Sequence, residues 1–436
     1  MTGVAVEPPV GRDSHPRTDQ PFDGSVPATV TPPAPPIVRA VPTALVAAVV
    51  FLTAVAPLAT DMYVTAFPTV EAEFRTSASA VQLTLTTFFA GMGLGQLVGG
   101  PFSDQRGRRL PLLAGTLLVV AASVVCALAP SIGVLTAARL VQGFAGGWVM
   151  VIARSVVVDL AHGAQLVRVL NVVMGIGGIA PVLGPLFGAA ILGFGDWRTT
   201  FWVLAGLGVL MCVTAAVVVP ESLPRDRRHA GGLRTFRLAA RQVLGDRRFV
   251  GYVVTACAAF VGVFAYVATS PFVLQTMNGL SPTAYAIDFA ANAGAMTVAS
   301  LLAARLAGRV STRRIILVGQ GCMGIAGAGM LIGAIWFGMP LIVALIGFFV
   351  LMIGNGLVVT NGGALASSAV PAHPGTSSAV LGLVQWTTAG VTAPIAGLGG
   401  SDTAVPMAVL VLGGALVSLW GLLVLARPHT TGRTTS

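Results

Sequence analysis

The chain has 436 residues, of which 55% are hydrophobic and only 9% are charged. Because a soluble domain carries about 25% charged residues, this composition excludes a soluble globular protein and indicates one embedded in a membrane. The formal net charge of +10 comes from 25 basic residues, all of them arginine. We expect no nucleic-acid binding from this charge, since the arginines fall in short loops between apolar runs, where they orient a membrane protein.

The first 40 residues contain nine prolines and few large apolar side chains. Such a composition cannot bury enough apolar surface to fold, so residues 1–40 are predicted to form a disordered cytoplasmic tail. No metal site is expected in the chain, because its four cysteines are scattered through different apolar runs, without a CxxC pair or a Cys–His spacing.

Twelve apolar runs follow the tail, and most approach the roughly 20 residues that span a bilayer as a helix. The first run is long, so its helix is expected to tilt or to extend beyond the hydrocarbon layer. The sequence therefore predicts an all-α polytopic membrane protein with twelve transmembrane helices. The expected runs are 41–70, 79–100, 110–129, 132–158, 169–194, 198–219, 249–272, 282–304, 314–337, 340–363, 376–398 and 403–426.

The arginines are distributed unequally between the two ends of these runs. With a cytoplasmic N-terminus, 21 of the 25 arginines fall in cytoplasmic segments. Arg75 and Arg198 fall in segments on the outer side of the membrane, whereas Arg139 and Arg154 lie within the fourth run. Because cytoplasmic loops carry an excess of basic residues, we expect both termini in the cytoplasm and a location in the cytoplasmic (inner) membrane.

The largest polar break divides the runs into two sets of six. The predicted organisation is a six-helix bundle over 41–219, a basic cytoplasmic linker over 220–248, a second six-helix bundle over 249–426 and a cytoplasmic tail over 427–436. An internal echo supports two pseudo-symmetric bundles, since "GPFSDQRGRRLPLL" follows the second run and "AGRVSTRRIILV" follows the eighth. Such repeats around a midplane cavity are typical of alternating-access transporters.

The segment "GPFSDQRGRR" (100–109) places four charges in a tight turn between the second and third runs. Gly100 and Gly107 permit close backbone approach and unusual dihedral angles. Asp104 can cap a helix or pair with an arginine. The alternative is a generic basic loop that only orients the chain. The arginines of the segment are Arg106, Arg108 and Arg109.

This segment resembles the loop signature of the major facilitator superfamily, G-x-x-x-D-R-x-G-R-R/K. Gln105 stands where the signature has its first arginine, and Arg106 is the substitute expected to pair with a carboxylate. The resemblance implies a two-bundle transporter fold and assigns this loop to the change between conformations.

The stretch "LTAARLVQGFAGG" (135–147) resembles the signature of the fourth span in the same superfamily, with Arg139, Gln142 and Gly143 in place. An arginine inside a bilayer span costs a few kcal/mol unless it is paired or hydrated, which makes Arg139 a functional candidate. The alternative is an arginine that snorkels to the nearby membrane surface.

The stretch "APVLGPLFGAA" (180–190) resembles the fifth-span signature associated with antiporters, G-x-x-x-G-P-x-x-G-G. Gly184, Pro185 and Gly188 match it, while Ala180 and Ala189 stand where glycine is usual. Small residues at intervals of four form a stripe for close helix packing. A plain packing groove is therefore the alternative to a specific role in antiport.

Shorter motifs extend the resemblance over nearly all of residues 41–426. Their series is similar to that of the Bcr/CflA-type drug–proton antiporters: "TDMY", "VQLTLTTFFAGMGLGQLVGGPFSD", "GDWRTTF", "PESLP", "TSPFVLQ" and "GTSSAVLGLVQ". This resemblance implies proton-coupled export of small amphiphilic drugs without a cofactor. The alternative is a proton-coupled exporter or importer of a small metabolite on the same fold. An enzyme is not expected, because no catalytic set of side chains clusters within the runs.

Two carboxylates, Asp61 and Asp288, lie within the runs, and Asp159 lies at the cytoplasmic end of the fourth. At 1.5 Å per residue, Asp61 and Arg139 both lie roughly 12 to 13 Å from the outer end of their runs and can share one layer. A dry cavity disfavours an ionised carboxylate, whereas a nearby arginine favours it. Asp61 is therefore predicted to carry a proton, to bind a cation, or to do both in competition. The alternative is a static Asp61–Arg139 pair that joins two helices.

The remaining candidates for a substrate cavity are polar and aromatic side chains within the runs. Asp288 is a candidate for this cavity or for a structural or interfacial role, and the others have the alternative of ordinary helix packing. We expect a monomer whose partners are a small-molecule substrate, protons and the lipid bilayer. The candidate hydrogen-bonding residues are Asn355, Asn361 and Gln385, and the candidate aromatic walls are Tyr63, Phe88, Phe89, Phe264, Tyr266 and Trp386.

Overall fold

The computed structural model describes residues 42–161, 165–166, 169, 172–173, 180–225, 228, 240–306, 308–370 and 374–427. This part of the chain is built of helices and contains no β-strand. The helices of the first half are α1 (Thr43–Val64), α2 (Phe67–Phe74), α3 (Ala78–Arg106), α4 (Arg109–Ala127), α5 (Ile132–Leu160), α7 (Ala180–Leu192) and α8 (Trp197–Val218). Those of the second half are α10 (Arg247–Pro271), η2 (Phe272–Met277), α11 (Pro282–Leu306), α12 (Thr312–Phe337), α13 (Leu341–Ala369), α14 (Pro374–Ala396), η3 (Gly397–Gly399), α15 (Val405–Trp420) and η4 (Gly421–Leu425).

Ten helices in the described residues are long and apolar enough to cross a membrane. The prediction of an all-helical, multi-pass membrane protein is thereby confirmed. The fifth and eleventh predicted runs correspond to α7 and α14. α7 is apolar but has 13 residues, and α14 has 23 residues but is rich in serine and threonine. The number of twelve membrane helices therefore stays a prediction.

Several helices begin where a short polar side chain caps the first turn. Ser77 and Ser131 accept hydrogen bonds from backbone N–H groups at the starts of α3 and α5. Asp196 does the same for α8, and Asp246 does so for α10. Each cap satisfies a backbone donor that has no partner inside the helix, which explains why these helices begin at those points.

The first predicted run, 41–70, forms two helices where one long helix was expected. α1 ends at Val64 and α2 begins at Phe67. The Thr65 hydroxyl donates to the Met62 carbonyl, a local bond that competes with continuation of the helix. Pro68 then lies in the first turn of α2, where its missing N–H leaves no bond unmade.

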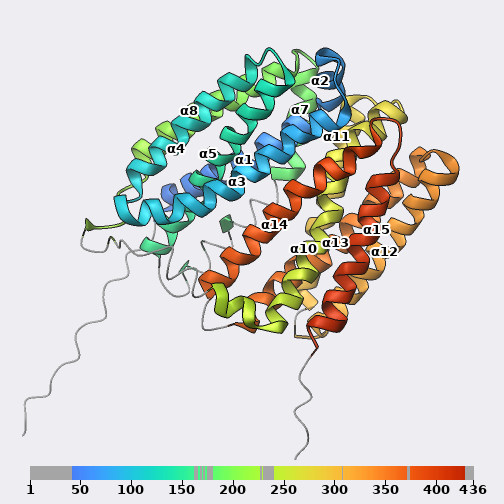
Figure 1. Ribbon diagram of the computed structural model, residues 1–436. Coiled ribbons are helices and arrows are strands. Elements are labelled where there is room, and N and C mark those ends of the chain that lie inside the picture. The colour runs from blue at the N-terminus through green and yellow to red at the C-terminus, as the bar shows by residue number, and fades with distance from the viewer. Residues whose placement is uncertain are drawn as a thin grey trace, which may run out of the picture. The chain divides into compact units, whose positions relative to one another are not determined.

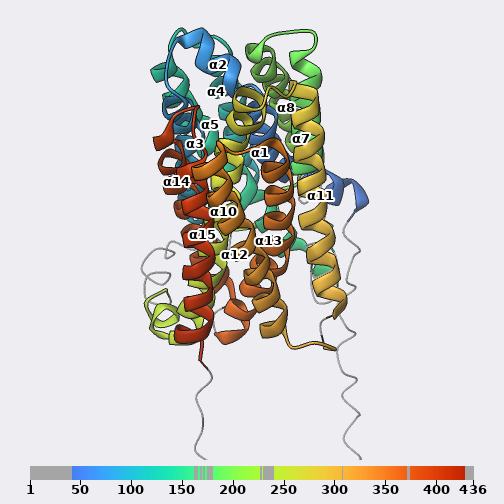
Figure 2. The ribbon, with the colours of Figure 1, turned by 90° about the vertical axis from the view of Figure 1, so that its right-hand side faces the viewer.

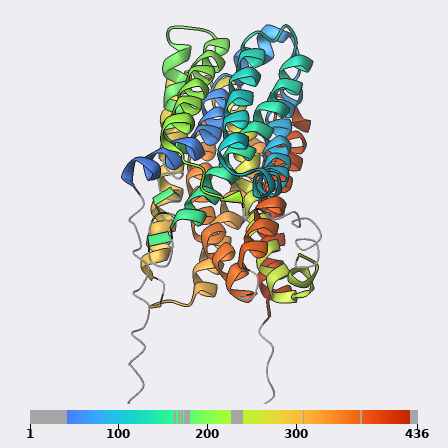
Figure 3. The same cartoon turned by 90° about the vertical axis from the view of Figure 1, so that its left-hand side faces the viewer.

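The two halves of the chain form two groups of helices (Figure 1). In the first group α3 packs along α5 and α4 along α8, and in the second α13 packs against α10, α11 and α12. Between the groups, α14 lies along α3 and α11 lies along α7. Figure 2 shows the second group in front, with α11 at its edge, and Figure 3 shows the first group in front.

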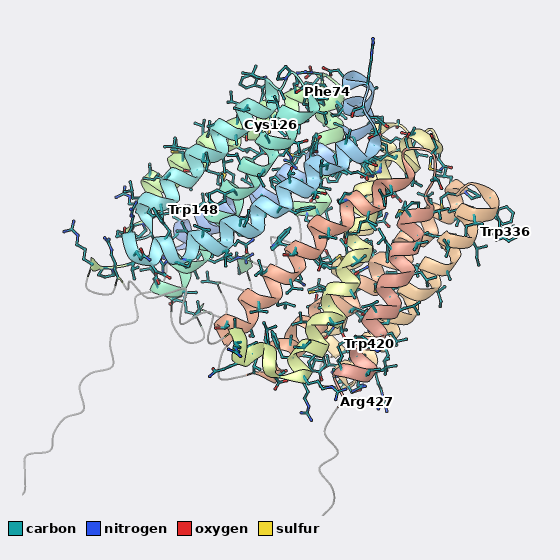
Figure 4. All side chains as sticks on the ribbon, in the orientation of Figure 1. Phe74, Cys126, Trp148, Trp336, Trp420 and Arg427 are labelled. Carbon is teal, nitrogen blue, oxygen red and sulfur yellow. The ribbon has the colours of Figure 1, made fainter. Side chains whose placement is uncertain are left out.

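The helix groups have two opposite ends, which we call the α2 end and the arginine end. Phe74 of α2 lies at the first, and Arg427, which follows η4, lies at the second (Figure 4). In the described part of the chain, hydrogen bonds between the groups occur only toward the α2 end. These bonds run from Ser79 Oγ to the Gly397 carbonyl, from Gln82 Nε2 to the Ala268 carbonyl (2.9 Å) and from Gln275 Nε2 to the Thr65 carbonyl (3.2 Å).

Several predicted segments lie wholly or mainly outside the described residues. These are the tail 1–40, much of the linker 220–248, the beginning of the run 169–194 and nearly all of the tail 427–436. The helices of the described residues hold the candidate site.

Candidate functional site

A cavity of about 230 Å³ lies between the two groups of helices. An engineered cavity of about 150 Å³ accommodates benzene, so this space can hold a small organic molecule. The lining comes from α1, α3 and α7 of the first group and from α10, α11, α13 and α14 of the second. Most of it is aliphatic or aromatic, and its aromatic residues include Phe88, Phe89, Phe264, Tyr266, Phe289 and Trp386.

Asp61 is the charged residue of this lining. It lies on α1, its side chain is 7% exposed, and the Thr60 hydroxyl donates to its Oδ1 at 3.3 Å. Within the described residues, Asp61 takes part in no ion pair. An ionised carboxylate in such surroundings is costly unless a positive charge compensates it. The position therefore suits a proton or the cationic group of a bound molecule.

The small residues of α7 pack directly against the Asp61 turn of α1. A Cβ on Gly184 would lie 2.5 Å from Asp61 Cβ, and a Cβ on Gly188 would lie 2.3 Å from the Met62 carbonyl oxygen. Pro185 is buried beside them. The stripe identified in the sequence thus lets α7 approach α1 closely at the cavity carboxylate.

Arg139 of α5 is enclosed by aromatic side chains. It is fully buried, and its guanidinium carbon lies 4.1 Å from the centroid of the Phe88 ring, 4.9 Å from that of Tyr63 and 5.8 Å from that of Phe201. Its Nη1 donates to Gln142 Oε1 at 2.7 Å and to the Ala59 carbonyl at 3.2 Å. The cation is thus stabilised by ring faces and neutral oxygens.

Two of the alternatives for Arg139 disagree with this geometry. A fully buried side chain does not snorkel to a membrane surface. No Asp61–Arg139 ion pair is present in the described residues, so the static pair is absent as well. The reason is the helical register of α1, which turns the Ala59 carbonyl toward Arg139 while Asp61 lines the cavity.

Arg108 is the centre of the charged loop between α3 and α4. Its guanidinium pairs with Asp104 at 2.5 Å and with Asp159 of α5 at 2.9 Å, and it donates to Ser103 Oγ at 2.7 Å. Burial lowers the pKa of this guanidinium, but the bonds to Asp159 and Asp104 outweigh burial and leave the pKa above its ordinary value. Arg108 therefore stays charged and ties the arginine ends of α3, α4 and α5 together.

The structure corrects two expectations for this loop. Arg106 was expected to pair with a carboxylate, but its guanidinium lies over the Phe102 ring at 4.5 Å, and Arg108 makes the carboxylate pairs. Gly100 was expected to permit close approach, but a Cβ there would make only an ordinary contact of 3.7 Å with Val151. Gly99, one residue earlier, faces α5 more closely than Gly100 does, with a Cβ contact of 3.1 Å to Trp148.

Glu221, which follows α8, is a residue whose role the sequence analysis missed. Its carboxylate accepts the backbone N–H groups of Arg108 (2.8 Å) and Arg109 (3.3 Å), so it caps the start of α4 from a distant part of the chain. Gly107 has φ +91°, and a Cβ there would lie 2.5 Å from Glu221 Oε2. Arg109 Nη2 also donates to the Ala216 carbonyl near the end of α8. The available signal was the acidic side chain within "PESLP", directly after an apolar run.

Asp288 is half-buried on α11 and does not line the cavity. Its Oδ2 accepts a hydrogen bond from Asn292 Nδ2 at 2.9 Å, and the same nitrogen donates to the Tyr266 hydroxyl at 3.2 Å. Tyr266 does line the cavity. Asn292 was absent from the sequence candidates, although its spacing of four residues from Asp288 places both on one helix face.

Of the other predicted cavity residues, Phe88, Phe89, Phe264 and Trp386 lie on the lining, and four more do not. Tyr63 bonds Thr84 and packs against Arg139. The amides of Asn355 and Asn361 donate to carbonyls of their own helix, α13, and Gln385 lies off the lining. Residues that line the cavity without having been predicted include Met92, Pro181, Met296 and Met352. These are apolar residues among many others in apolar helices, so no sequence signal separates them.

The described residues contain no group of three or more His, Cys, Asp or Glu side chains that could hold a metal ion. The polar residues on the cavity lining are Asp61, Thr60, Tyr266 and Trp386.

Comparison with known proteins places this geometry in context. Residues 49–397 match the family model described as Major Facilitator Superfamily. The chain is 35% identical over 363 residues to the "Uncharacterized MFS-type transporter YdgK" of Bacillus subtilis, covering 83% of this chain and 90% of that protein. It is 27% identical to the bicyclomycin resistance protein homolog of Haemophilus influenzae, covering 80% and 88%, and 27% identical to the multidrug resistance protein MdtL of Salmonella heidelberg, covering 76% and 82%.

Solved structures resemble the fold at lower sequence identity. A D-xylose-proton symporter matches with a TM-score of 0.70 at 17% identity, covering 89% of this chain and 99% of that chain. A bacterial homolog of the human lysosomal transporter Spinster, in an inward-facing and unoccupied conformation, matches with a TM-score of 0.65 at 17% identity, covering 81% and 80%. At this identity the likeness concerns the fold alone.

Proposed function

The chain belongs to the major facilitator superfamily of membrane transporters, and from that premise we propose that it exports small amphiphilic molecules, antibiotics among them, in exchange for protons. One observation carries the proposal: the buried carboxylate of Asp61, which forms no ion pair within the described residues, lies on the wall of a largely aromatic and aliphatic cavity. An amphiphile fits such a wall, and the carboxylate accepts either a proton or a cation. The names of the bicyclomycin- and multidrug-resistance relatives support the same substrate class.

Exchange follows if proton and substrate compete for Asp61. A proton arriving from outside neutralises the carboxylate and weakens its hold on a cationic or hydrogen-bond-donating substrate. Loss of the proton to the cytoplasm restores the charge and the affinity. A ligand shifts a conformational equilibrium only through its different affinities for the two states, so the neutral and charged forms of Asp61 must favour different conformations for transport to be coupled.

The direction of the cavity follows from the arginines. With the arginine end in the cytoplasm, as an excess of basic residues predicts, the α2 end faces outside in the inner membrane. The three hydrogen bonds between the groups then seal the outer side, and the conformation corresponds to an inward-facing state. In this proposal α7 and α14 complete twelve spans, and the transporter acts as a monomer.

Everted membrane vesicles with an imposed proton gradient test the proposal. Vesicles containing the protein should accumulate chloramphenicol or ethidium, and a protonophore should abolish the accumulation. Accumulation that survives the protonophore would refute proton coupling. Movement of the probe in the same direction as protons would favour the alternative, an importer of a small metabolite on the same fold.

The Asp61→Asn variant tests the assigned carboxylate. Asparagine keeps nearly the same shape as aspartate and can still hydrogen-bond, but it cannot titrate, so the variant should lose accumulation against a gradient. Proton release on addition of a bound probe, followed with a pH dye in detergent, should vanish in Asp61→Asn and persist in Asp288→Asn. The opposite pattern would move the coupling site to α11.

A further inference from the structure

The cavity wall has a second polar element, on the side of the second helix group. The Tyr266 hydroxyl of α10 accepts a hydrogen bond from Asn292 Nδ2, which also donates to Asp288 Oδ2 on the same helix, α11. Asn292 is 1% exposed and Tyr266 is 2% exposed. Tyr266 belongs to the cavity lining, whereas Asn292 and Asp288 lie behind it. The three side chains therefore form a short chain of hydrogen bonds that ends at the substrate cavity.

The donors and acceptors along this series of hydrogen bonds fix the role of the Tyr266 phenol. The NH₂ side of the Asn292 amide is turned toward Asp288, whose Oδ2 accepts a hydrogen bond from it at 2.9 Å. That same nitrogen reaches Tyr266, whose oxygen must then be the acceptor. The phenolic proton of Tyr266 is left to donate elsewhere, and the described residues offer it no acceptor.

Packing holds the phenol in place. The Tyr266 ring stacks on Phe289 at 5.3 Å between centroids and meets the Phe348 ring edge-on at 4.8 Å. An immobilised donor on an apolar wall discriminates strongly between ligands, because a mismatched ligand leaves a buried polar group unpaired.

We propose that Tyr266 is a specificity-determining hydrogen-bond donor for a carbonyl, ether or hydroxyl oxygen of the substrate, and that Asn292 and Asp288 are positioning residues that keep it a donor. The inference rests on the cavity being the substrate site of the proposed function. It adds a substrate class: molecules with an oxygen acceptor on an apolar body, in addition to any group that meets Asp61.

Two probes separate this role from general packing. Chloramphenicol carries carbonyl and hydroxyl oxygens, whereas tetraphenylphosphonium is an aromatic cation without a hydrogen-bonding group. Binding of each to the purified full-length protein is measured by quenching of tryptophan fluorescence, since Trp386 lines the cavity. The variants are Tyr266→Phe, which is nearly isosteric, Asn292→Ala, and the two combined.

Tyr266→Phe should weaken chloramphenicol binding about three- to tenfold, the range expected for one neutral hydrogen bond, and leave tetraphenylphosphonium within about twofold. Asn292→Ala should weaken chloramphenicol less, and the double variant should match Tyr266→Phe, because the amide acts through the phenol. Equal weakening of both probes, no weakening of either, or no binding to the wild-type protein would overturn the inference. Since the assay uses no gradient, a failure of proton-driven export would leave its result unchanged and would count against the proposed function alone.

Discussion

A single methyl group at Gly397 should open the α2 end of the transporter. Gly397 lies in η3, where it faces α3, and a Cβ there would lie 1.7 Å from Gln82 Oε1 and 3.1 Å from Ser79 Cα. Gln82 is fully buried and its amide donates to the Ala268 carbonyl at 2.9 Å. Gly397→Ala therefore forces either the glutamine out of its hydrogen bond or the two helix groups apart.

The size of the effect follows from these contacts. Overpacking of this kind costs about 1 to 3 kcal/mol, and a displaced glutamine additionally loses a bond of about 1 kcal/mol. The penalty applies only while η3 is packed against α3, so it falls on the closed state and spares the open one. A difference of about 1 to 3 kcal/mol changes the ratio of the two states about five- to 150-fold.

Distances between spin labels report this equilibrium. Labels on Ala72 of α2 and Thr283 of α11, both exposed at the α2 end, should show a longer distance population in Gly397→Ala than in the wild-type protein. The matched control is Gly390→Ala on α14, where a Cβ would lie an ordinary 3.6 Å from the Thr86 carbonyl oxygen of α3. The reasoning is refuted if Gly397→Ala shifts the distances no further than this control.

Three further predictions concern the site and its surroundings. Arg139→Met keeps an unbranched side chain but removes the cation from its aromatic cage. The variant should remain in the membrane and reduce vesicle accumulation of chloramphenicol at least tenfold. Normal accumulation would exclude a functional role for the cation. Gly184→Ala should lower the free energy of unfolding by about 1 to 3 kcal/mol, because its Cβ would lie 2.5 Å from Asp61 Cβ. The control Gly206→Ala, which has open space around it, should leave the free energy of unfolding unchanged. Equal melting temperatures of the two variants would contradict the close packing. Partial burial and the neighbouring negative charge of Asp402, on the other helix group, raise the pKa of the Glu71 carboxyl. The state with a closed α2 end therefore binds the Glu71 proton more tightly than the open state does. The closed state gains stability as pH falls through the raised pKa, and the gain is complete below the ordinary carboxyl range. Glu71→Gln should remove that pH dependence from the spin-label distances, and an unchanged dependence would assign it to another group.

The sequence by itself determined the class of protein and the direction of its chemistry. In a continuous apolar run of bilayer length the backbone polar groups are satisfied in lipid by hydrogen bonds within a helix. The all-helical membrane fold therefore followed from the composition and the length of the apolar runs. A charged side chain inside such a run is costly and therefore rare, which is why the sequence singled out Asp61 and Arg139 as candidates. The glycine spacing around Gly184 likewise predicted close packing, because only small residues permit that approach.

Tertiary structure decided which of these groups meet. Asp61 and Arg139 lie at similar depth in the sequence reading, yet the register of α1 turns Asp61 to the cavity and leaves Arg139 among Phe88, Tyr63 and Phe201. Residues far apart in the chain also came together, as when Glu221 caps α4. Hydropathy records how apolar a helix is and barely records which face it turns inward, because in a membrane the lipid-facing and buried sides are both apolar. The cavity lining, and with it the link from Asp288 through Asn292 to Tyr266, could therefore be read only from the packed helices.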